Sequence, residues 1–216
     1  MGSTPSIPDT IDLDDIIAST GLAKNQISAL WVRFEELDQD VNGEGKGSKG
    51  YLTLDDLSRV PKFDENPMAS RLMKVIFDDF GTDGKLNFKH FVQFMSIFSR
   101  RESSLRTTAD TSKKILKNDE SDVSYSMHDT NVARKIKFIF RMYDIDRDGK
   151  ISKEDAQETL KMMVGKISDE EASIIAERVI GEFTDNNPNS TVDLSTFENT
   201  LKILDFNEKM GLKLLK

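Results

Sequence analysis

The chain has no cysteine, only two histidines and a single tryptophan among its 216 residues. Without cysteine it has no disulfide framework and no thiol nucleophile, which is compatible with a cytosolic protein. Because His90 and His128 are its only imidazoles, the sequence contains no recognisable set of nucleophile, base and orienting group. We therefore expect a protein that is not an enzyme.

Long apolar runs and an excess of basic residues are also missing. No apolar run approaches the roughly 18 residues of a membrane-spanning helix, and we recognise no secretory signal. The formal net charge is -8 at pH 7, whereas a nucleic-acid-binding surface requires a basic stripe. We expect a protein that binds no nucleic acid and contacts membranes only through a lipid or a partner.

One acidic segment, 144–155, has the spacing of a helix-loop-helix calcium loop. Aspartates occupy loop positions 1, 3 and 5, Gly149 at position 6 permits the sharp bend, and position 7 supplies a backbone carbonyl. Apolar stripes of helical spacing flank the loop, which disfavours the competing interpretation as an acidic surface turn. The expected metal ligands are Asp144, Asp146, Asp148, Lys150 and Asp155, with Ser152 acting through a water molecule.

The last ligand departs from the calcium pattern. Position 12 holds Asp155, whereas a glutamate normally grips calcium there through both oxygens. The aspartate is one methylene shorter, so calcium loses an oxygen or the loop contracts. Magnesium takes fewer ligands at shorter distances and keeps some of its water, so the change penalises magnesium less. We expect one weakly held ion with a mainly structural role, calcium or, as the alternative, magnesium.

Calcium loops usually pair through a short antiparallel strand centred on position 8, which is Ile151 here. Leu52, Leu86 and Val192 likewise stand between two apolar helical patterns, and the capping-box pattern 168–171 predicts the start of the helix before the fourth loop. The apolar stripe expected on that helix is Ile175, Val179, Ile180 and Phe183. The sequence thus predicts an all-α fold of four EF-hand units in two pairs, resembling calmodulin and calcineurin B, with short paired loop strands.

The other three loops depart from the metal-binding pattern. The first, 38–56, spans nineteen residues instead of twelve and contains a glycine-rich insertion. The second, 79–90, has glycine at position 3 and histidine at position 12. The fourth, 185–196, places a proline and an asparagine in its middle, but weak binding stays open there because it keeps Asp185, Asn187 and Asp193. We expect these three units to persist as packing modules without a metal.

Composition divides the chain into four segments. Residues 99–130 contain eleven serines or threonines, no glycine and no proline, which is typical of a linker. Around it we expect an N-terminal segment at 1–20, a pair of degenerate EF-hand units at 21–98, and a second pair with a C-terminal tail at 131–216. A hydrophobic content of 37% in a chain of this length is sufficient for sizeable cores.

The amino terminus fits a lipidation signal. The sequence Met-Gly-Ser-Thr-Pro-Ser predicts myristoylation of Gly2 after removal of the methionine, with a cloning scar as the competing interpretation. Four aspartates follow and no lysine appears before Lys24, so the basic cluster that commonly assists a single acyl chain is missing. We expect stable membrane attachment to require a membrane-embedded partner, or the acyl chain to fold back into the protein.

Several short segments, spread over nearly the whole chain, carry a family resemblance. Residues 137–144, 160–165 and 66–67 look like calcineurin B and its homologous proteins. The ending 204–215, together with the amino-terminal signal and the long linker, resembles the calcineurin B homologous proteins in particular. That family usually binds metal in its third and fourth units, so the eroded fourth loop and the short last ligand of the third are departures.

The resemblance implies a regulatory subunit that clamps an amphipathic helix of a plasma-membrane sodium/proton exchanger and supports its stability and activity. It also implies a cytoplasmic protein, peripheral at the plasma membrane. The alternative is a calcineurin B-type protein, whose partner is the catalytic subunit of a calcium-dependent phosphatase. Nine methionines and thirteen phenylalanines independently suit a helix-binding groove. Phe138 falls off the main apolar stripe of its helix, so we expect it to line that groove.

Overall fold

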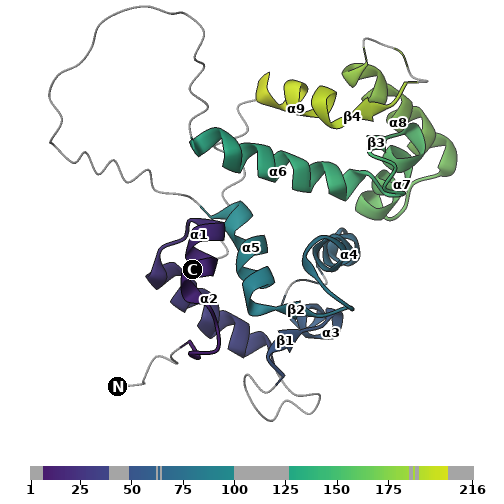
Figure 1. Cartoon of the computed structure of the whole chain (residues 1–216). Coiled ribbons are helices and arrows are strands. Elements are labelled where there is room, and N and C mark those ends of the chain that lie inside the picture. Colours follow the sequence, from purple (N-terminus) through teal and green to yellow (C-terminus); the bar gives the residue numbers. More distant parts are fainter. Residues whose placement is uncertain are drawn as a thin grey trace, which may run out of the picture.

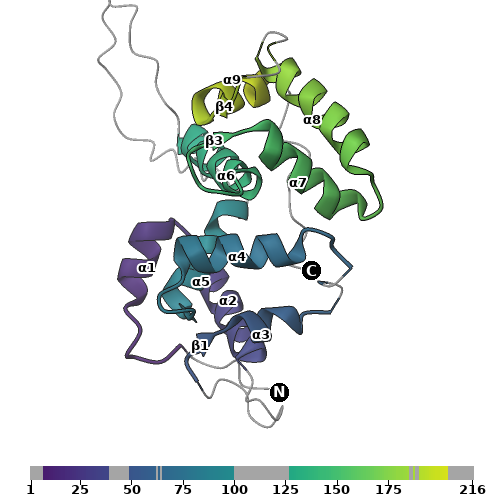
Figure 2. The same ribbon diagram turned by 90° about the vertical axis from the view of Figure 1, so that its right-hand side faces the viewer.

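The computed structural model describes residues 7–38, 49–61, 63, 65–99, 127–184, 187 and 190–203, and Figures 1 and 2 show two groups of helices. The N-terminal half contains α1 (Leu13–Thr20), α2 (Lys24–Leu37), β1 (Tyr51–Leu52), α3 (Leu54–Ser58), α4 (Ala69–Phe80), β2 (Leu86–Asn87) and α5 (Phe88–Phe98). The C-terminal half contains α6 (Met127–Tyr143), β3 (Lys150–Ile151), α7 (Lys153–Val164), α8 (Asp169–Phe183), β4 (Val192–Asp193) and α9 (Leu194–Ile203).

One short antiparallel strand pair joins the two loops of each half. Leu52 of β1 lies opposite Leu86 of β2, and Ile151 of β3 lies opposite Val192 of β4. All four side chains are buried, so each pairing anchors its loops to a hydrophobic core. The predicted fold class is confirmed: the described chain is mainly helical, with four helix-loop-helix units in two pairs.

The helices that follow the four loops begin with the same side-chain cap. Thr53, Asn87, Ser152 and Asp193, each at loop position 9, accept a hydrogen bond from the backbone N–H three residues ahead, at 3.4, 2.9, 3.1 and 2.8 Å. Such caps satisfy an N–H group that the first turn of a helix leaves unpaired. Because this cap needs no metal, all four units keep their geometry after three of them have lost the metal pattern.

Each half has its own hydrophobic core. In the N-terminal half, Trp31 and Phe34 of α2 meet Phe88 of α5 edge to face, with ring centroids 4.8 and 5.4 Å apart. In the C-terminal half, Phe140 of α6 packs edge to face on Phe197 of α9 at 5.6 Å. Edge-to-face pairs of this kind add to the stabilisation that comes from burial alone.

The expected apolar stripe on α8 is partly wrong. Ile180 is buried, but Ile175 and Val179 are 41% and 38% exposed, and Ala172 and Ala176 are buried instead. Helix α8 lies against α7 and buries these small side chains, whereas the bulkier Ile175 and Val179 face outward. The sequence prediction relied on apolar character and helical spacing alone, so it assigned the larger residues to the core.

The helix after the predicted linker begins earlier in the sequence than expected. Helix α6 begins at Met127, four positions before the boundary at 131, and residues 100–126 lie outside the described residues, as does Gly2. The division into four segments therefore stays a prediction. No helix in the described ranges combines the length and the apolar character needed to cross a bilayer.

Candidate metal centre

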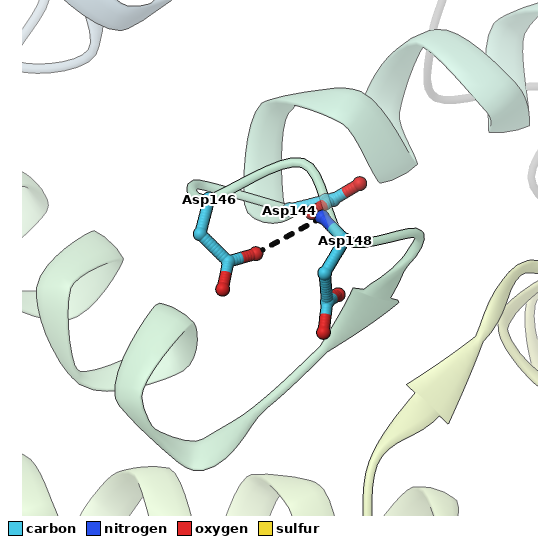
Figure 3. A group of neighbouring side chains, drawn as sticks. All are labelled: Asp144, Asp146 and Asp148. Carbon is cyan, nitrogen blue, oxygen red and sulfur yellow. Dashed lines mark hydrogen bonds between the residues drawn. The ribbon is translucent and has the colours of Figure 1, made fainter.

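Three aspartates converge in the loop between α6 and β3. Asp144, Asp146 and Asp148 each place one carboxylate oxygen within 4.8 Å of the others, as Figure 3 illustrates. No other group of three acidic or histidine side chains converges this closely within the part of the chain that the structure describes. These are three of the five protein ligands that the sequence predicts.

The loop backbone is wound around these carboxylates. Gly149 has φ +86, a conformation that glycine adopts without steric cost. Its N–H donates to Asp144 at 3.3 Å, while the N–H groups of Asp148 and Lys150 donate to Asp146 and Asp148 at 3.1 and 2.8 Å. Figure 3 shows the contact between Asp146 and Asp148. The remaining carboxylate lone pairs stay free to bind a cation.

Asp144 is electrostatically unusual. Its side chain is fully buried, and Oδ1 has no hydrogen-bond partner among the described residues. Burial raises the pKa of this carboxyl, although the N–H of Gly149 and the Arg141 guanidinium act in the opposite direction. A buried acceptor without a partner is costly. A cation at the carboxylate cluster would satisfy it, so the residues present fit a hard metal ion with oxygen ligands.

Asp155, the predicted last ligand, lies outside the carboxylate cluster. Its Oδ1 accepts the N–H of Ile145 at 3.0 Å, and its Oδ2 accepts the N–H and Oγ of Ser152 at 2.8 and 2.6 Å. Asp155 and Ser152 thus form a reciprocal capping box at the start of α7. Metal ligation by Asp155, by the Lys150 carbonyl and by Ser152 through water stays a prediction.

The second and fourth loops use their aspartates for other contacts. Asp79, at position 1 of the second loop, pairs with Arg141 at 3.1 Å and lies 3.6 Å from Arg147. Asp193 accepts the N–H of Thr196 and the hydroxyl of Ser195, both at 2.8 Å. Asp185 and the proline and asparagine at 188–189 lie outside the described residues, so binding at the fourth loop is untested.

An arginine from the N-terminal half contacts the start of the metal loop. Arg71 of α4 is buried, and its guanidinium donates to the carbonyls of Arg141, Met142 and Asp144 at 2.7, 3.1 and 2.5 Å. These are carbonyls that the end of α6 leaves unpaired, and a cation is favoured at that end of a helix. The role of Arg71 was not predicted from the sequence, because no local pattern marks a contact across some seventy positions.

Two ion pairs extend the contact between α4 and α6, which face each other in Figure 2. Arg147, at position 4 of the metal loop, pairs with Asp78 of α4 at 2.5 Å. Arg141 pairs with Asp79 and also lies 3.6 Å from the carboxylate of Asp144. The N-terminal half therefore contacts both the first ligand residue and the loop itself.

Phe138, the predicted groove residue, is buried and belongs to the N-terminal core cluster. Its ring lies 5.6 Å from that of Phe94 and 5.3 Å from that of Phe98, both on α5. A substitution of Phe138 would therefore alter the packing between the two halves before it affected a partner. A direct role in partner binding stays a prediction.

The comparisons with known proteins agree with this architecture. The EF-hand domain family matches residues 135–168, which include the metal loop. The chain is 29% identical to the calcineurin B protein of Naegleria gruberi, covering 99% of this chain and 100% of that protein. It is 30% identical to the calcineurin B protein of Candida glabrata, covering 76% of this chain and 71% of that protein.

Among solved structures, a chain described as a PP2A PR70 holoenzyme is 14% identical, with a TM-score of 0.49, covering 93% of this chain and 67% of that chain. A similarity of this size supports no inference about function.

Proposed function

The chain belongs to the calcineurin B-like family of EF-hand proteins, and on that premise we propose that it is a non-catalytic regulatory subunit. In this role it binds calcium and holds an amphipathic helix of a partner protein. The observation that supports the calcium role is the carboxylate cluster of the third loop, in which buried Asp144 lacks a partner for one oxygen. Asp144, Asp146 and Asp148 would hold the ion, and its charge would offset the carboxylates.

The exposed surface of the C-terminal half supports the helix-binding role. Large apolar side chains on α7 and α8 are between 38% and 63% exposed, namely Met163, Val164, Ile174, Ile175 and Val179. The charged residues of the same helix α8 are mostly acidic, namely Asp169, Glu170, Glu171, Glu177 and Glu182, beside the basic Arg178. Apolar and acidic side chains together suit a partner helix with one apolar face and basic flanks.

Two partners suit this proposal, and different observations favour each. The names of the relatives favour the catalytic subunit of a phosphatase, because both relatives are subunits of calcineurin. The resemblance of the ending 204–215 and of the amino terminus to calcineurin B homologous proteins favours a sodium/proton exchanger, although both segments lie outside the described residues. We propose the regulatory role as the function and leave these two partners to a direct binding test.

That test offers the purified full-length chain two labelled peptides, a calcineurin-B-binding helix of a phosphatase and a cytoplasmic helix of a sodium/proton exchanger. Fluorescence anisotropy in calcium and in chelator measures both affinities. A calcium dependence of about tenfold or more, with preference for the phosphatase helix, favours the phosphatase. Tight binding of the exchanger helix that persists in chelator favours the exchanger. Failure to bind either peptide contradicts the proposal.

Matched surface variants locate the binding site in the same assay. Ile174→Glu changes the most exposed apolar residue of α8, which is 63% exposed, so it should weaken helix binding without unfolding the chain. Leu54→Glu is the control, because Leu54 is 49% exposed but lies on α3 in the other half. Equal effects of the two variants would contradict a binding surface on α7 and α8.

For localisation we propose a cytoplasmic protein that is peripheral at the plasma membrane and is attached by a lipid on Gly2 and by its partner. A single acyl chain gives only marginal membrane affinity. Gly2→Ala should therefore reduce membrane residence in cell fractionation only partly while the partner is present. Complete release into the soluble fraction would show that the lipid is the main anchor.

A further inference from the structure

The first loop has the same end geometry as the metal loop, although it is seven residues longer. Asp38 follows α2 as Asp144 follows α6, both side chains are fully buried, and both N–H groups donate back into the preceding helix. Gly50, with φ +74, donates its N–H to Asp38 at 2.7 Å, as Gly149 does to Asp144. Gly50 and Gly149 both occupy position 6, because each lies six residues before the aspartate at position 12. The extra residues of the first loop therefore lie between positions 1 and 5.

Lys49 therefore occupies position 5 of the first loop, where the third loop has Asp148. Its ammonium Nζ lies 2.7 Å from both carboxylate oxygens of Asp56, the residue at position 12, and 3.8 Å from Asp38 at position 1. The backbone N–H of Lys49 also donates to Asp38, at 3.3 and 3.2 Å. The lysine side chain is only 21% exposed, and the two carboxylates are essentially buried.

We propose that Lys49 is the cation of the first loop, a covalently attached replacement for a metal ion. Its ammonium contacts the carboxylates of positions 1 and 12, the first and last ligand positions of a calcium loop. An N⁺–H···O⁻ contact of 2.7 Å is close to the 2.3–2.6 Å of calcium–oxygen contacts. The insertion is then not the only feature that disfavours a metal ion in the first loop. The Lys49 ammonium already supplies a positive charge at the ligand positions.

The position-12 residues of the two loops support this assignment. Asp56 and Asp155 form the same capping box, with Thr53 and Ser152 respectively. Asp56 directs its carboxylate to the ammonium, whereas Asp155 accepts the N–H of Ile145. Burial alone would raise the pKa of Asp56, but the hydrogen bonds from Lys49 and Thr53 together lower it. The Lys49 ammonium therefore keeps the first loop in this conformation at every calcium concentration.

The test isolates the first loop by working in full-length chain that carries Asp144→Ala. Trp31, the only tryptophan, lies on α2 in the N-terminal core and reports unfolding of this half by fluorescence. Thermal unfolding is followed in chelator and in calcium of several millimolar, above the roughly 10⁻⁴–10⁻³ M dissociation constants of weak EF-hand sites. The chain with Lys49 should show the same midpoint in both solutions.

Lys49→Met should lower the midpoint in chelator, and calcium should restore part of the loss because two buried carboxylates then lack a cation. Lys89→Met is the matched control, since Lys89 pairs with Asp15 at 2.6 Å but both side chains are over 40% exposed. Lys49→Arg should keep the midpoint near that of the parent because it keeps the charge. If Lys49→Met does not fold in chelator, Lys49→Gln provides the same comparison with a smaller loss of hydrogen bonding.

Two results would overturn the proposal. One is a calcium-dependent midpoint in the chain that retains Lys49, which would mean that the lysine leaves the site open. The other is the absence of calcium rescue. In that case Lys49→Met and Lys49→Gln lower the unfolding midpoint by an amount that calcium does not restore, or they lower it no more than Lys89→Met does. The lysine would then be an ordinary ion pair and not a substitute for a metal.

Discussion

The first and third loops provide a direct comparison of two ways to neutralise buried carboxylates. Both place a fully buried aspartate at position 1, a glycine at position 6 and an aspartate at position 12. In the first, the Lys49 ammonium lies between the first and last carboxylates. In the third, three aspartates converge, and one oxygen of Asp144 has no partner among the described residues.

The difference separates a permanent cation from an exchangeable one. A tethered ammonium cannot dissociate, so the first unit is insensitive to calcium concentration, whereas a bound metal ion links the stability of the third unit to its concentration. Because Arg71 joins α4 to the end of α6, the half that contains the Lys49 loop also contacts the start of the metal loop. Substitutions that change one loop at a time therefore test whether the two loops differ in this way.

The largest effect is expected from Asp144→Ala. This variant removes the buried position-1 ligand of the third loop, so calorimetric titration should detect no calcium or magnesium binding. Asp79→Ala is the control, because Asp79 occupies position 1 of the second loop but pairs with Arg141 at 3.1 Å. It should leave metal stoichiometry unchanged. Residual binding in Asp144→Ala would show a second site that the loop comparison has missed.

Arg71→Met should separate the two halves energetically. The variant removes three hydrogen bonds from a buried guanidinium to backbone carbonyls, and it should lower the free energy of unfolding by about 3 kcal/mol. Chemical denaturation in chelator measures the loss. Arg33→Met is the matched control, since Arg33 pairs with Glu36 on the surface and should change stability by less than about 1 kcal/mol. Similar losses in both variants would rule out a special role for Arg71.

The two loops should respond to acid with opposite signs. The pKa of Asp56 is lowered from 3.8, so its stabilisation is complete above pH 3.8 and is lost as the pH falls through the lowered value. The pKa of Asp144 is raised from 3.8 because of burial. Its stabilisation is therefore present below pH 3.8 and is lost as the pH rises through the raised value.

At pH 7 in chelator, Asp56→Asn should therefore destabilise the chain by about 2 kcal/mol, while Asp144→Asn should stabilise it by about 1 kcal/mol. Denaturant titration of both variants measures the difference. The controls are exposed neighbours, Asp55→Asn in the first unit and Asp146→Asn in the third, which should change stability little. Effects of the same sign at Asp56 and Asp144 would contradict the comparison between the loops.

A smaller gain is expected from Asp155→Glu. The longer side chain restores the reach for bidentate calcium binding, and glutamate also suits the third position of a capping box. Calcium affinity should rise by about tenfold, with improved selectivity over magnesium. Competition titration with a calcium indicator measures both. Unchanged calcium affinity would show that position 12 does not contribute to ligation.

Local patterns were sufficient to predict most of the fold. The positions of Leu52, Leu86, Ile151 and Val192 predicted both strand pairs in the observed register. Alternation of apolar stripes with turn residues supplies this information because it repeats within each unit. The same kind of pattern was wrong for Ile175 and Val179, because α8 buries Ala172 and Ala176 in place of these more apolar residues.

The candidate site was predictable where its chemistry lies in one short segment. The aspartates of the third loop are brought together by loop geometry, so their spacing is informative. The roles of Arg71 and Lys49 were not predicted, because Arg71 acts across the two halves and Lys49 follows an insertion that hides its loop position. Both become visible only when the backbone places a cation beside carbonyls or carboxylates.

The most direct measurement is the calcium stoichiometry of the intact chain, determined by isothermal titration calorimetry and native mass spectrometry. One ion per chain, lost in Asp144→Ala and retained in Lys49→Arg, is the predicted result, because the first loop already holds its own cation. Two or more ions per chain, together with a calcium-dependent unfolding midpoint of the Trp31 half in Asp144→Ala with Lys49 intact, would contradict the distinction between a permanent and an exchangeable cation.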